Sequence, residues 1–290
     1  MQKPHEIILR LKKFVVLTVL TALAFPVSAG GANITVKGSD TLVILAQKWA
    51  EIYMSQHPET KIQVTGGGSG VGFAALQNKT TDVANASRKI RYSEQIECVK
   101  AFGKRPTEYK VALDGLSVYV HESNPVSELT VDQLGRIFTG KVRNWNEVGG
   151  PDSPITIYSR ENSSGTYEFF KEHVLRGKDF AARAQTMPGT AALLSAVGKD
   201  RNGIGYGGAA YGAGAKHIKV RKDESSPAIE PNERTVLDQS YPIWRYLYVY
   251  VNPELDKGEI QKYLGWIRSE DGQKVVKDVG YYPLPKRLRE

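Results

Sequence analysis

The chain has 290 residues, and its 39 Lys and Arg outnumber its 31 Asp and Glu, which gives a formal net charge of +8. Its single cysteine, Cys98, excludes an intrachain disulfide and a cysteine-based zinc site, and the histidines show no metal-ligand spacing, so we expect no metal. The basic residues do not cluster with aromatic residues, which disfavours a nucleic-acid groove, although a positive field helps to attract a small anion.

The first segment has the pattern of a secretory signal peptide. Arg10, Lys12 and Lys13 precede an apolar run over residues 14–25, and residues 26–29 supply the small side chains that a signal peptidase reads. The run is shorter than the roughly 20 apolar residues that cross a bilayer. We therefore predict a signal peptide over residues 1–29, cleavage after Ala29 and a soluble periplasmic protein. No cysteine stands at the cleavage point, so a lipid anchor is disfavoured.

Short β-branched runs then alternate with helical periods, which is typical of α/β proteins. In chain order, the pattern predicts a strand at 34–36, a helix at 41–57, a strand at 62–64, a helix near 71–77, a strand from 82 and, near the end, a helix at 257–270. Helix 41–57 would bury the side of Leu45, Trp49 and Tyr53, while the last helix would bury Leu264 and Ile267.

Two long β-rich segments, 111–121 and 243–251, enclose a stretch with its own alternation of strands and helices. This arrangement predicts one domain inserted into another, with the two segments as paired crossover strands that form a hinge. Lobe 1 would consist of residues 31–117 and 248–290, and lobe 2 of residues 118–247.

Three segments join a strand end, a turn rich in Gly, Ser or Thr, and a helix start. They are GSDT at 38–41, GGGSG at 66–70 and SRENSSGT at 159–166. The first N–H groups of a helix have no partner within the helix, and the helix dipole is positive there, so such turns bind anions. Each turn alone is equally an ordinary helix cap, but three in one chain predict a small anion held by several helix ends.

Two arginines are candidates for contact with this anion. Arg160 lies in the third turn, and its planar fork of donors suits a tetrahedral oxyanion. Its alternative is a surface pair with the adjacent Glu161. Arg88, just after a strand, is the second candidate.

Other uses of the glycines do not fit their spacing. No Lys follows them in the register of a P-loop, the acidic residue of a dinucleotide fingerprint is missing from its place, and Val71 stands where a nucleophile elbow requires Gly. We therefore expect no cofactor and no catalytic residue.

Several longer motifs resemble the PstS-like family, the phosphate-binding components of Pst ABC uptake systems. The matching segments are GSDT at 38–41, VTGGGSGVG at 64–72, DVANASR at 82–88, LTVDQLGRIFTGKVRNWNEVGG at 129–150, SRENSSGTYEFF at 159–170 and GIGYGGAAY at 203–211. The resemblance implies a type II periplasmic-binding fold, in which two α/β lobes close on inorganic phosphate. It also implies a monomeric receptor, not an enzyme, that delivers phosphate to a membrane permease.

The resemblance further implies a set of ligand-binding residues contributed by both lobes. These are Thr41 and the backbone of Leu42, Ser69 and Gly70 in the glycine turn, and Arg160, Ser164, Gly165 and Thr166 from the other lobe. The segment around 137–145 resembles a structural part of the family: Thr130 would cap a short helix with Leu134, Ile137 and Phe138 inward, and Trp145 would pack near the lobe surface.

The chain departs from the family pattern at Arg88, where well-known members carry an Asp that accepts the phosphate proton and rejects sulfate. Asp40, in the first anion turn, is the best candidate to replace it, and capping of the following helix is an equal alternative. Another tetrahedral oxyanion, such as sulfate or molybdate, is the alternative ligand. A phosphomonoesterase or an adhesin on the same scaffold is a further alternative.

Overall fold

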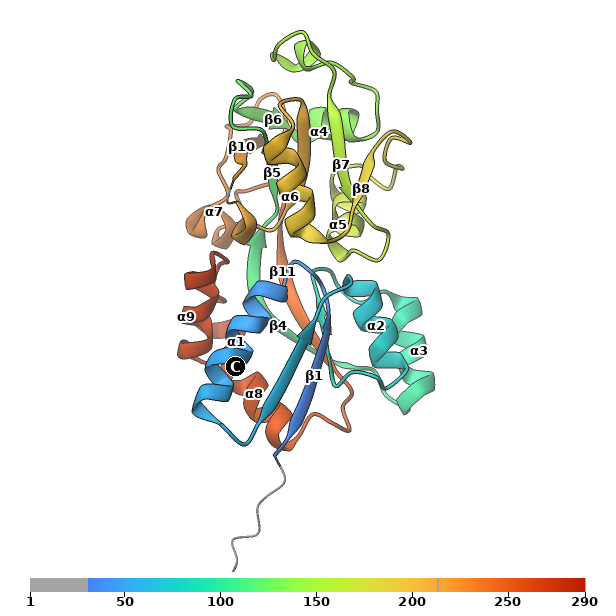
Figure 1. Ribbon diagram of the computed structural model, residues 1–290, viewed down its shortest axis with the longest axis vertical. Helices are drawn as coiled ribbons and strands as arrows, with labels where there is room; N and C mark the ends of the chain where they lie inside the picture. The colour runs from blue at the N-terminus through green and yellow to red at the C-terminus, as the bar shows by residue number, and fades with distance from the viewer. Residues whose placement is uncertain (1–30, 213, 290) are drawn as a thin grey trace, which may run out of the picture. The chain divides into compact units, whose positions relative to one another are not determined.

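The computed structural model describes residues 31–212 and 214–289, so the predicted signal peptide lies outside the described residues. The described residues form an α/β unit with two mixed sheets, as Figure 1 shows. We call the first sheet with its helices lobe 1 and the second sheet with its helices lobe 2. The predicted fold class, an α/β protein of two lobes, is confirmed. Among the described residues, no helix combines the length and apolarity needed to span a bilayer.

Lobe 1 is built on a five-stranded sheet of order β2-β1-β3-β11-β4. Its strands are β1 (Asn33–Gly38), β2 (Lys61–Thr65), β3 (Val83–Ala86), β4 (Thr107–Gly115) and β11 (Trp244–Val251). Its helices are α1 (Val43–Gln56), α2 (Ser69–Gln77), α3 (Tyr92–Phe102), α8 (Gly258–Arg268) and α9 (Glu270–Val279), followed by a short 3-10 helix η3 (Lys286–Leu288). Helices α1, α8 and α9 cover one face of this sheet, and α2 and α3 cover the other (Figure 1).

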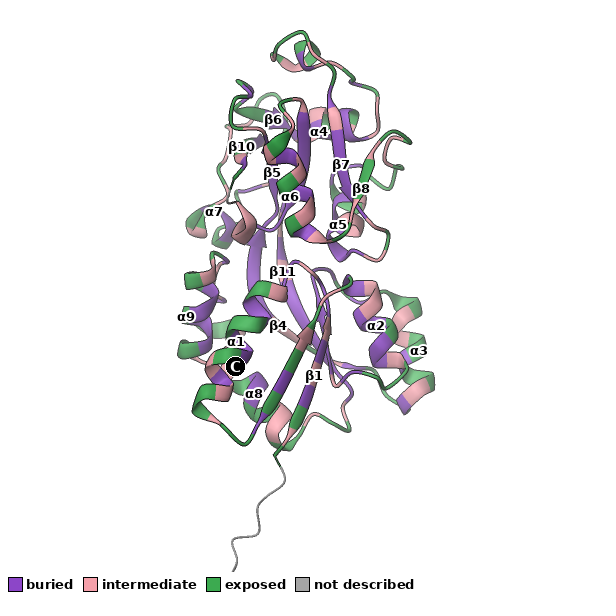
Figure 2. Ribbon diagram, in the orientation of Figure 1, coloured by how far each residue is buried: buried purple, intermediate pink, exposed green. Residues whose placement is uncertain are grey.

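Lobe 2 is built on a six-stranded sheet of order β6-β10-β5-β9-β7-β8. Its strands are β5 (Ser117–Val120), β6 (Glu128–Thr130), β7 (Thr156–Arg160), β8 (Gln185–Met187), β9 (Gly203–Gly207) and β10 (Lys216–Arg221). Its helices are α4 (Val131–Phe138), η1 (Trp145–Val148), α5 (Gly165–His173), α6 (Gly189–Lys199), η2 (Ala209–Tyr211) and α7 (Glu233–Leu237). The central strands of lobe 2, such as β5 and β9, are completely buried, whereas the edge strand β8 is largely exposed (Figure 2).

The apolar periodicity places the helices as predicted. In α1, the residues Leu45, Trp49 and Tyr53 are all at most 1% exposed, and the Trp49 indole donates to the Gly272 carbonyl at 2.8 Å. The helix begins at Val43, two residues later than predicted, because residues 39–42 form a turn in which the Leu42 N–H donates to the Ser39 carbonyl. Thr130 caps α4 as predicted.

The two crossovers lie side by side. A single residue, Leu116, separates β4 from β5, and its N–H donates to the Ile243 carbonyl at 2.9 Å, just before β11 begins. Strand β11 then pairs antiparallel with β4 over its whole length, from Trp244 opposite Gly115 onwards. The predicted lobe boundaries at 117/118 and 247/248 remain a prediction, and this pairing places residues 244–247, which were assigned to lobe 2, in the sheet of lobe 1.

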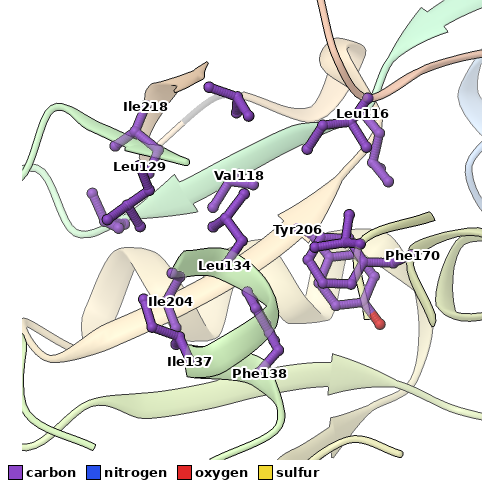
Figure 3. Packing of buried hydrophobic residues seen from close by; sticks show 14 of the residues in the cluster. Leu116, Val118, Leu129, Leu134, Ile137, Phe138, Phe170, Ile204, Tyr206 and Ile218 are labelled. Carbon is purple, nitrogen blue, oxygen red and sulfur yellow. The ribbon is translucent and has the colours of Figure 1, made fainter. Parts of the chain in front are cut away.

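The core of lobe 2 contains a group of stacked aromatic rings (Figure 3). The Phe170 and Tyr206 rings stack with centroids 4.1 Å apart, and the Phe138 ring meets both edge-on at 4.8 and 5.5 Å. Leu134, Ile137 and Phe138 face inward, as predicted. Trp145 was expected near the lobe surface but is completely buried in the apolar core of lobe 2, where its indole N–H donates to the Asn202 carbonyl.

We predict that Phe138→Ala lowers the free energy of unfolding by about 3–5 kcal/mol, because it removes a fully buried ring and leaves a cavity. Urea denaturation measures this loss. The matched control is Tyr92→Ala, since the Tyr92 ring is 72% exposed and its removal should change the unfolding free energy by less than about 0.5 kcal/mol. Equal losses in the two variants would contradict the packing described for this core.

Candidate functional site

Four buried hydroxyl groups form a cluster where the two lobes meet. Thr41 Oγ1 of lobe 1 and Thr166 Oγ1 of lobe 2 share a hydrogen bond of 2.7 Å. Ser87 Oγ lies 3.4 Å from Thr166 Oγ1 and 3.4 Å from Ser69 Oγ, which accepts a hydrogen bond from the Ser87 N–H. All four residues are at most 1% exposed. We call Thr41, Ser69, Ser87 and Thr166 the hydroxyl cluster.

Helix starts position most of these hydroxyls. Ser69 is the first residue of α2, Gly165 and Thr166 are the first two residues of α5, and Thr41 lies in the turn before α1. The N–H groups at such positions have no partner within their helix, and the dipoles of the helices place partial positive charge there. A hydroxyl can rotate its proton toward an acceptor. The cluster is therefore suited to donate hydrogen bonds to a small anion.

The three predicted anion turns are brought together by contacts between them. Asp40 of the first turn accepts a hydrogen bond from the Gly67 N–H of the second at 2.8 Å and from Arg160 Nη2 of the third at 2.8 Å. The Gly70 N–H of the second turn donates to the Ser163 carbonyl of the third at 2.9 Å. Asp40 thus connects both lobes beside the hydroxyl cluster.

Two glycines allow this close approach of the lobes. A Cβ on Gly165 would lie 2.2 Å from Ser69 Oγ and 2.8 Å from Ser87 Oγ. Gly68 has a φ of +97°, and a Cβ there would lie 2.4 Å from the Ser163 carbonyl oxygen. No residue with a side chain fits either position without moving the lobes apart, so glycine is required by contact at both places and by backbone conformation at Gly68.

Arg160 lies at the end of β7 and is 2% exposed. Its guanidinium donates to Asp40, to Thr190 Oγ1 at 2.8 Å and to both carboxylate oxygens of Glu161. Burial acts to raise the pKa of Glu161, but the hydrogen bond and charge of Arg160 outweigh it, and the net pKa is lowered. The predicted pair with Glu161 is therefore present, although its Arg160 side chain is buried and only Glu161 is partly exposed.

Two other predicted residues have local roles. The Ser164 hydroxyl accepts a hydrogen bond from the Tyr167 N–H at 3.3 Å, so Ser164 is the N-cap of α5. The Leu42 N–H is engaged with the Ser39 carbonyl. These contacts, like that of the Gly70 N–H, satisfy groups that the sequence assigned to the anion.

Two tyrosines fix the backbone of the first turn. The Tyr211 hydroxyl donates to the Asp40 carbonyl at 2.6 Å, and the Tyr281 hydroxyl donates to the Thr41 carbonyl at 2.6 Å. Burial raises the pKa of Tyr211 to about 12 and raises that of Tyr281 as well. Both hydroxyls consequently remain protonated donors at neutral pH and hold Asp40 and Thr41 in place.

Arg245 of β11 is a site residue that the sequence analysis missed. Its Nη2 donates to Thr166 Oγ1 at 3.1 Å, and its Nη1 donates to the Ser87 carbonyl at 3.0 Å. Two further hydrogen bonds, of 2.9 and 2.8 Å, join it to Asp114 Oδ2. Arg245 and Asp114 are 3% and 0% exposed. An arginine in the otherwise apolar run 244–251 was the available signal, because an arginine is rarely buried without a partner.

Arg88 does not reach the hydroxyl cluster through any contact that the structure records. Its guanidinium donates to both carboxylate oxygens of Glu94, at 2.8 and 2.7 Å, and lies 4.9 Å from the centre of the Phe73 ring. Its Nε lies 2.5 Å from Glu168 Oε2. The structure therefore places Arg88 apart from the hydroxyl cluster, and its contact with an anion stays a prediction.

One group of possible metal ligands lies elsewhere in the described part of the chain. Ligand atoms of His57, Glu59 and Glu259 lie within 4.8 Å of one another. Glu259 already accepts hydrogen bonds from Tyr53 and Thr60 and pairs with Lys262. The group is partly exposed and shares no residue with the hydroxyl cluster, so we assign it no metal.

Comparison with known proteins identifies relatives over most of the chain. The family profile of the PBP superfamily domain matches residues 24–271. The phosphate-binding protein PstS of Pseudomonas aeruginosa is 35% identical over 280 residues, which cover 91% of this chain and 86% of that protein. PstS of Staphylococcus aureus is 32% identical over 259 residues, covering 86% and 78%. A solved structure of a putative phosphate ABC transporter substrate-binding protein with bound phosphate, from Clostridium perfringens, has a TM-score of 0.80 and 28% identity, covering 87% of this chain and 100% of that one.

We predict that Gly165→Ala separates the lobes, because the added methyl group would collide with Ser69 and Ser87. Small-angle X-ray scattering should show a larger radius of gyration, while circular dichroism shows unchanged helix content. Gly265→Ala is the matched control: Gly265 lies in α8, an added methyl group there would have nothing within 4 Å, and alanine should stabilise the helix by up to about 1 kcal/mol. An unchanged radius of gyration in Gly165→Ala would show that the lobes do not meet at this residue.

Proposed function

Because this chain belongs to the PBP superfamily and, within it, to the family of the PstS phosphate-binding proteins, we propose that it captures inorganic phosphate between its two lobes for an ABC transporter. The observation that carries the proposal is the contact of Thr41 and Thr166, hydroxyl donors from separate lobes, at 2.7 Å. A small tetrahedral ion offers little apolar surface, so its binding depends on such donors converging from several directions.

The donor set supports affinity for an anion of this size. The hydroxyl cluster and the first N–H groups of α5 supply neutral donors, and Arg245 supplies a buried positive charge that already contacts Thr166. A hydrogen bond to a charged group contributes about 1.5–3 kcal/mol. Several of them therefore reach the roughly 8 kcal/mol of micromolar binding. Arg160 is a second cation near the site, and it is connected to the site by its hydrogen bond to Asp40.

We assign to Asp40 the acceptance of the phosphate proton. Asp40 lies in the same turn as Thr41, and its carboxylate accepts hydrogen bonds from the Gly67 N–H and from Arg160. Each carboxylate oxygen has a second lone pair for a further hydrogen bond. A phosphate that carries a proton can donate to this carboxylate, whereas a fully ionised sulfate cannot and would be repelled. Asp40 would thereby replace the Asp of the family pattern, which is absent at Arg88.

Transport requires release as well as capture. Phosphate would favour the closed state, in which Thr166 meets Thr41, and the closed lobes would present one surface to a membrane permease. We propose that the signal peptide over residues 1–29 directs export to the periplasm with cleavage after Ala29, and that the protein acts there as a monomer. Membership of a periplasmic binding-protein family supports the compartment.

A hydrolytic role has no support from the site. The histidines of the described residues, His57, His121, His173 and His217, contact Glu59, Ser123, the Phe169 carbonyl and Glu230. None of these contacts involves the hydroxyl cluster, so no described histidine is placed to activate one of its hydroxyls for attack. We propose that the protein is a receptor, and incubation with a chromogenic phosphate ester should give no turnover proportional to protein.

We predict that Thr166→Val weakens phosphate binding by about 10- to 100-fold, because valine keeps the shape of threonine and removes a donor to a charged ligand. Isothermal titration calorimetry measures the change. Thr139→Val is the control, since the Thr139 hydroxyl bonds to the Gly135 carbonyl within lobe 2, away from the cluster. If Thr166→Val binds phosphate as tightly as the unmodified protein and the control, the hydroxyl cluster is not the binding site.

We predict that Asp40→Asn reduces the preference for phosphate over sulfate by about tenfold or more, because the amide retains the shape of the side chain but removes the carboxylate that repels sulfate. Titration of both anions at several pH values measures the preference. A preference that survives intact in Asp40→Asn would remove Asp40 as the discriminator. A stronger affinity for sulfate than for phosphate in the unmodified protein would favour the alternative oxyanion ligand.

A further inference from the structure

A cluster of ionised side chains joins the two lobes outside the hydroxyl cluster. Glu168 of α5 places Oε2 at 2.5 Å from Arg88 Nε, and its Oε1 forms an ion pair with Arg91 Nε. Arg88 follows β3 and Arg91 precedes α3, so both arginines belong to lobe 1, whereas Glu168 belongs to lobe 2. We call Arg88, Arg91 and Glu168 the interlobe ion cluster.

Contacts within lobe 1 that do not involve Glu168 orient Arg88 and Arg91. Both outer nitrogens of Arg88 donate to Glu94, which lies in lobe 1 and also accepts from the Arg91 N–H at 2.8 Å. The Phe73 ring supports the same guanidinium. The Nε edge of Arg88 is left to face Glu168. Lobe 1 therefore presents a fixed donor edge to a single carboxylate of lobe 2.

Burial makes the contact sensitive to lobe separation. The side chains of Arg88 and Glu168 are 7% and 20% exposed, while that of Arg91 is 52% exposed. Charges in a partly buried environment attract each other more strongly than charges in water, and salt screens them less. Separation of the lobes would break both pairs at once and return the Glu168 carboxylate to water.

The position of Glu168 connects this contact to the anion site. Glu168 lies in the first turn of α5, two residues after Thr166, and its N–H donates to the N-cap carbonyl of Ser164. A force that holds Glu168 against lobe 1 therefore also holds Thr166 against Thr41. Glu168 forms no recorded contact with the hydroxyl cluster itself, so its effect on an anion must pass through the placement of α5 (Figure 1).

We propose that Glu168 is a positioning residue for oxyanion binding, which holds the start of α5 against Arg88 and Arg91 and so stabilises the closed arrangement of the lobes. The inference rests on the proposed capture of phosphate. It adds that the Glu168 carboxylate controls how long the ligand is retained. A cavity of about 970 Å³ lies next to the cluster and is lined by Arg88, Arg91 and Glu168, so water and ions reach it from one side. Added salt should therefore weaken the ion pairs of Glu168 with Arg88 and Arg91.

The test compares Glu168→Gln with the unmodified protein, using inorganic phosphate. Glutamine keeps the size of the side chain and removes the charge. We expect phosphate affinity to fall by about 5- to 30-fold, mainly through faster release in stopped-flow measurements, because the variant retains the anion donors but loses part of the closure energy. We also expect a larger radius of gyration in the absence of phosphate and a weaker salt dependence of release.

Two further variants separate this role from a general effect on α5. Lys171→Gln removes a charge from the same helix, but the ion-pair partner of Lys171 is Asp179, which lies within lobe 2. This variant should leave phosphate release unchanged. Arg91→Gln should reproduce part of the Glu168→Gln effect, and the double variant Arg91→Gln/Glu168→Gln should lose no more than Glu168→Gln alone. Equal loss in Lys171→Gln and Glu168→Gln would overturn the proposal.

The outcomes also distinguish this inference from the proposed function. If the unmodified protein binds no phosphate, the proposed function fails, and the radius of gyration of the phosphate-free proteins still decides whether Glu168 holds the lobes together. If phosphate binds and Glu168→Gln shows the same affinity, release rate and radius of gyration as the unmodified protein, the positioning role is refuted.

Discussion

The structure depends on the approach of one helix start to a lobe that is distant from it in sequence. Thr166, the second residue of α5, contacts Thr41 across 125 positions of the chain. Neither residue belongs to the apolar core cluster of its own lobe, and both are almost completely buried where the lobes meet. The same approach brings the dipole of α5 to the place where α2 begins. Two partial positive charges facing each other are unfavourable in themselves, and an anion between them relieves the repulsion.

Buried ionic contacts control this approach from two sides. Asp114 holds Arg245 beneath the hydroxyl cluster, and Asp40 holds Arg160 beside it, so each arginine is oriented by a carboxylate. A buried pair of this kind adds little net stability, because the desolvation of both ions opposes their attraction. Its effect is to fix geometry: an arginine with a paired carboxylate keeps one orientation, and the donors that it directs toward Thr166 or Asp40 remain in place before a ligand arrives.

Local patterns in the sequence were sufficient for the α/β alternation, the paired crossovers and the three anion turns. Leu45, Trp49 and Tyr53 repeat at helical spacing, so their burial followed from periodicity, and the β-rich run 244–251 predicted a strand. The convergence of the turns could be anticipated only from their number and from resemblance to a family. The contacts of Arg245 and Arg88 could not be anticipated, because they depend on partners such as Asp114 and Glu168 that lie many residues away. A one-dimensional pattern carries no information on which of several arginines meets which carboxylate.

Leu116 has a mechanical consequence. This residue is the entire link between β4 and β5, it is fully buried, and its N–H is bonded to the returning chain at Ile243. Strand β11 begins beside it, so two passages of the chain between the lobes lie together at this point. The lobes are consequently joined by a very short hinge. A change in backbone torsion at this point would swing one lobe relative to the other, whereas sliding of the lobes would break the hydrogen bond between Leu116 and Ile243.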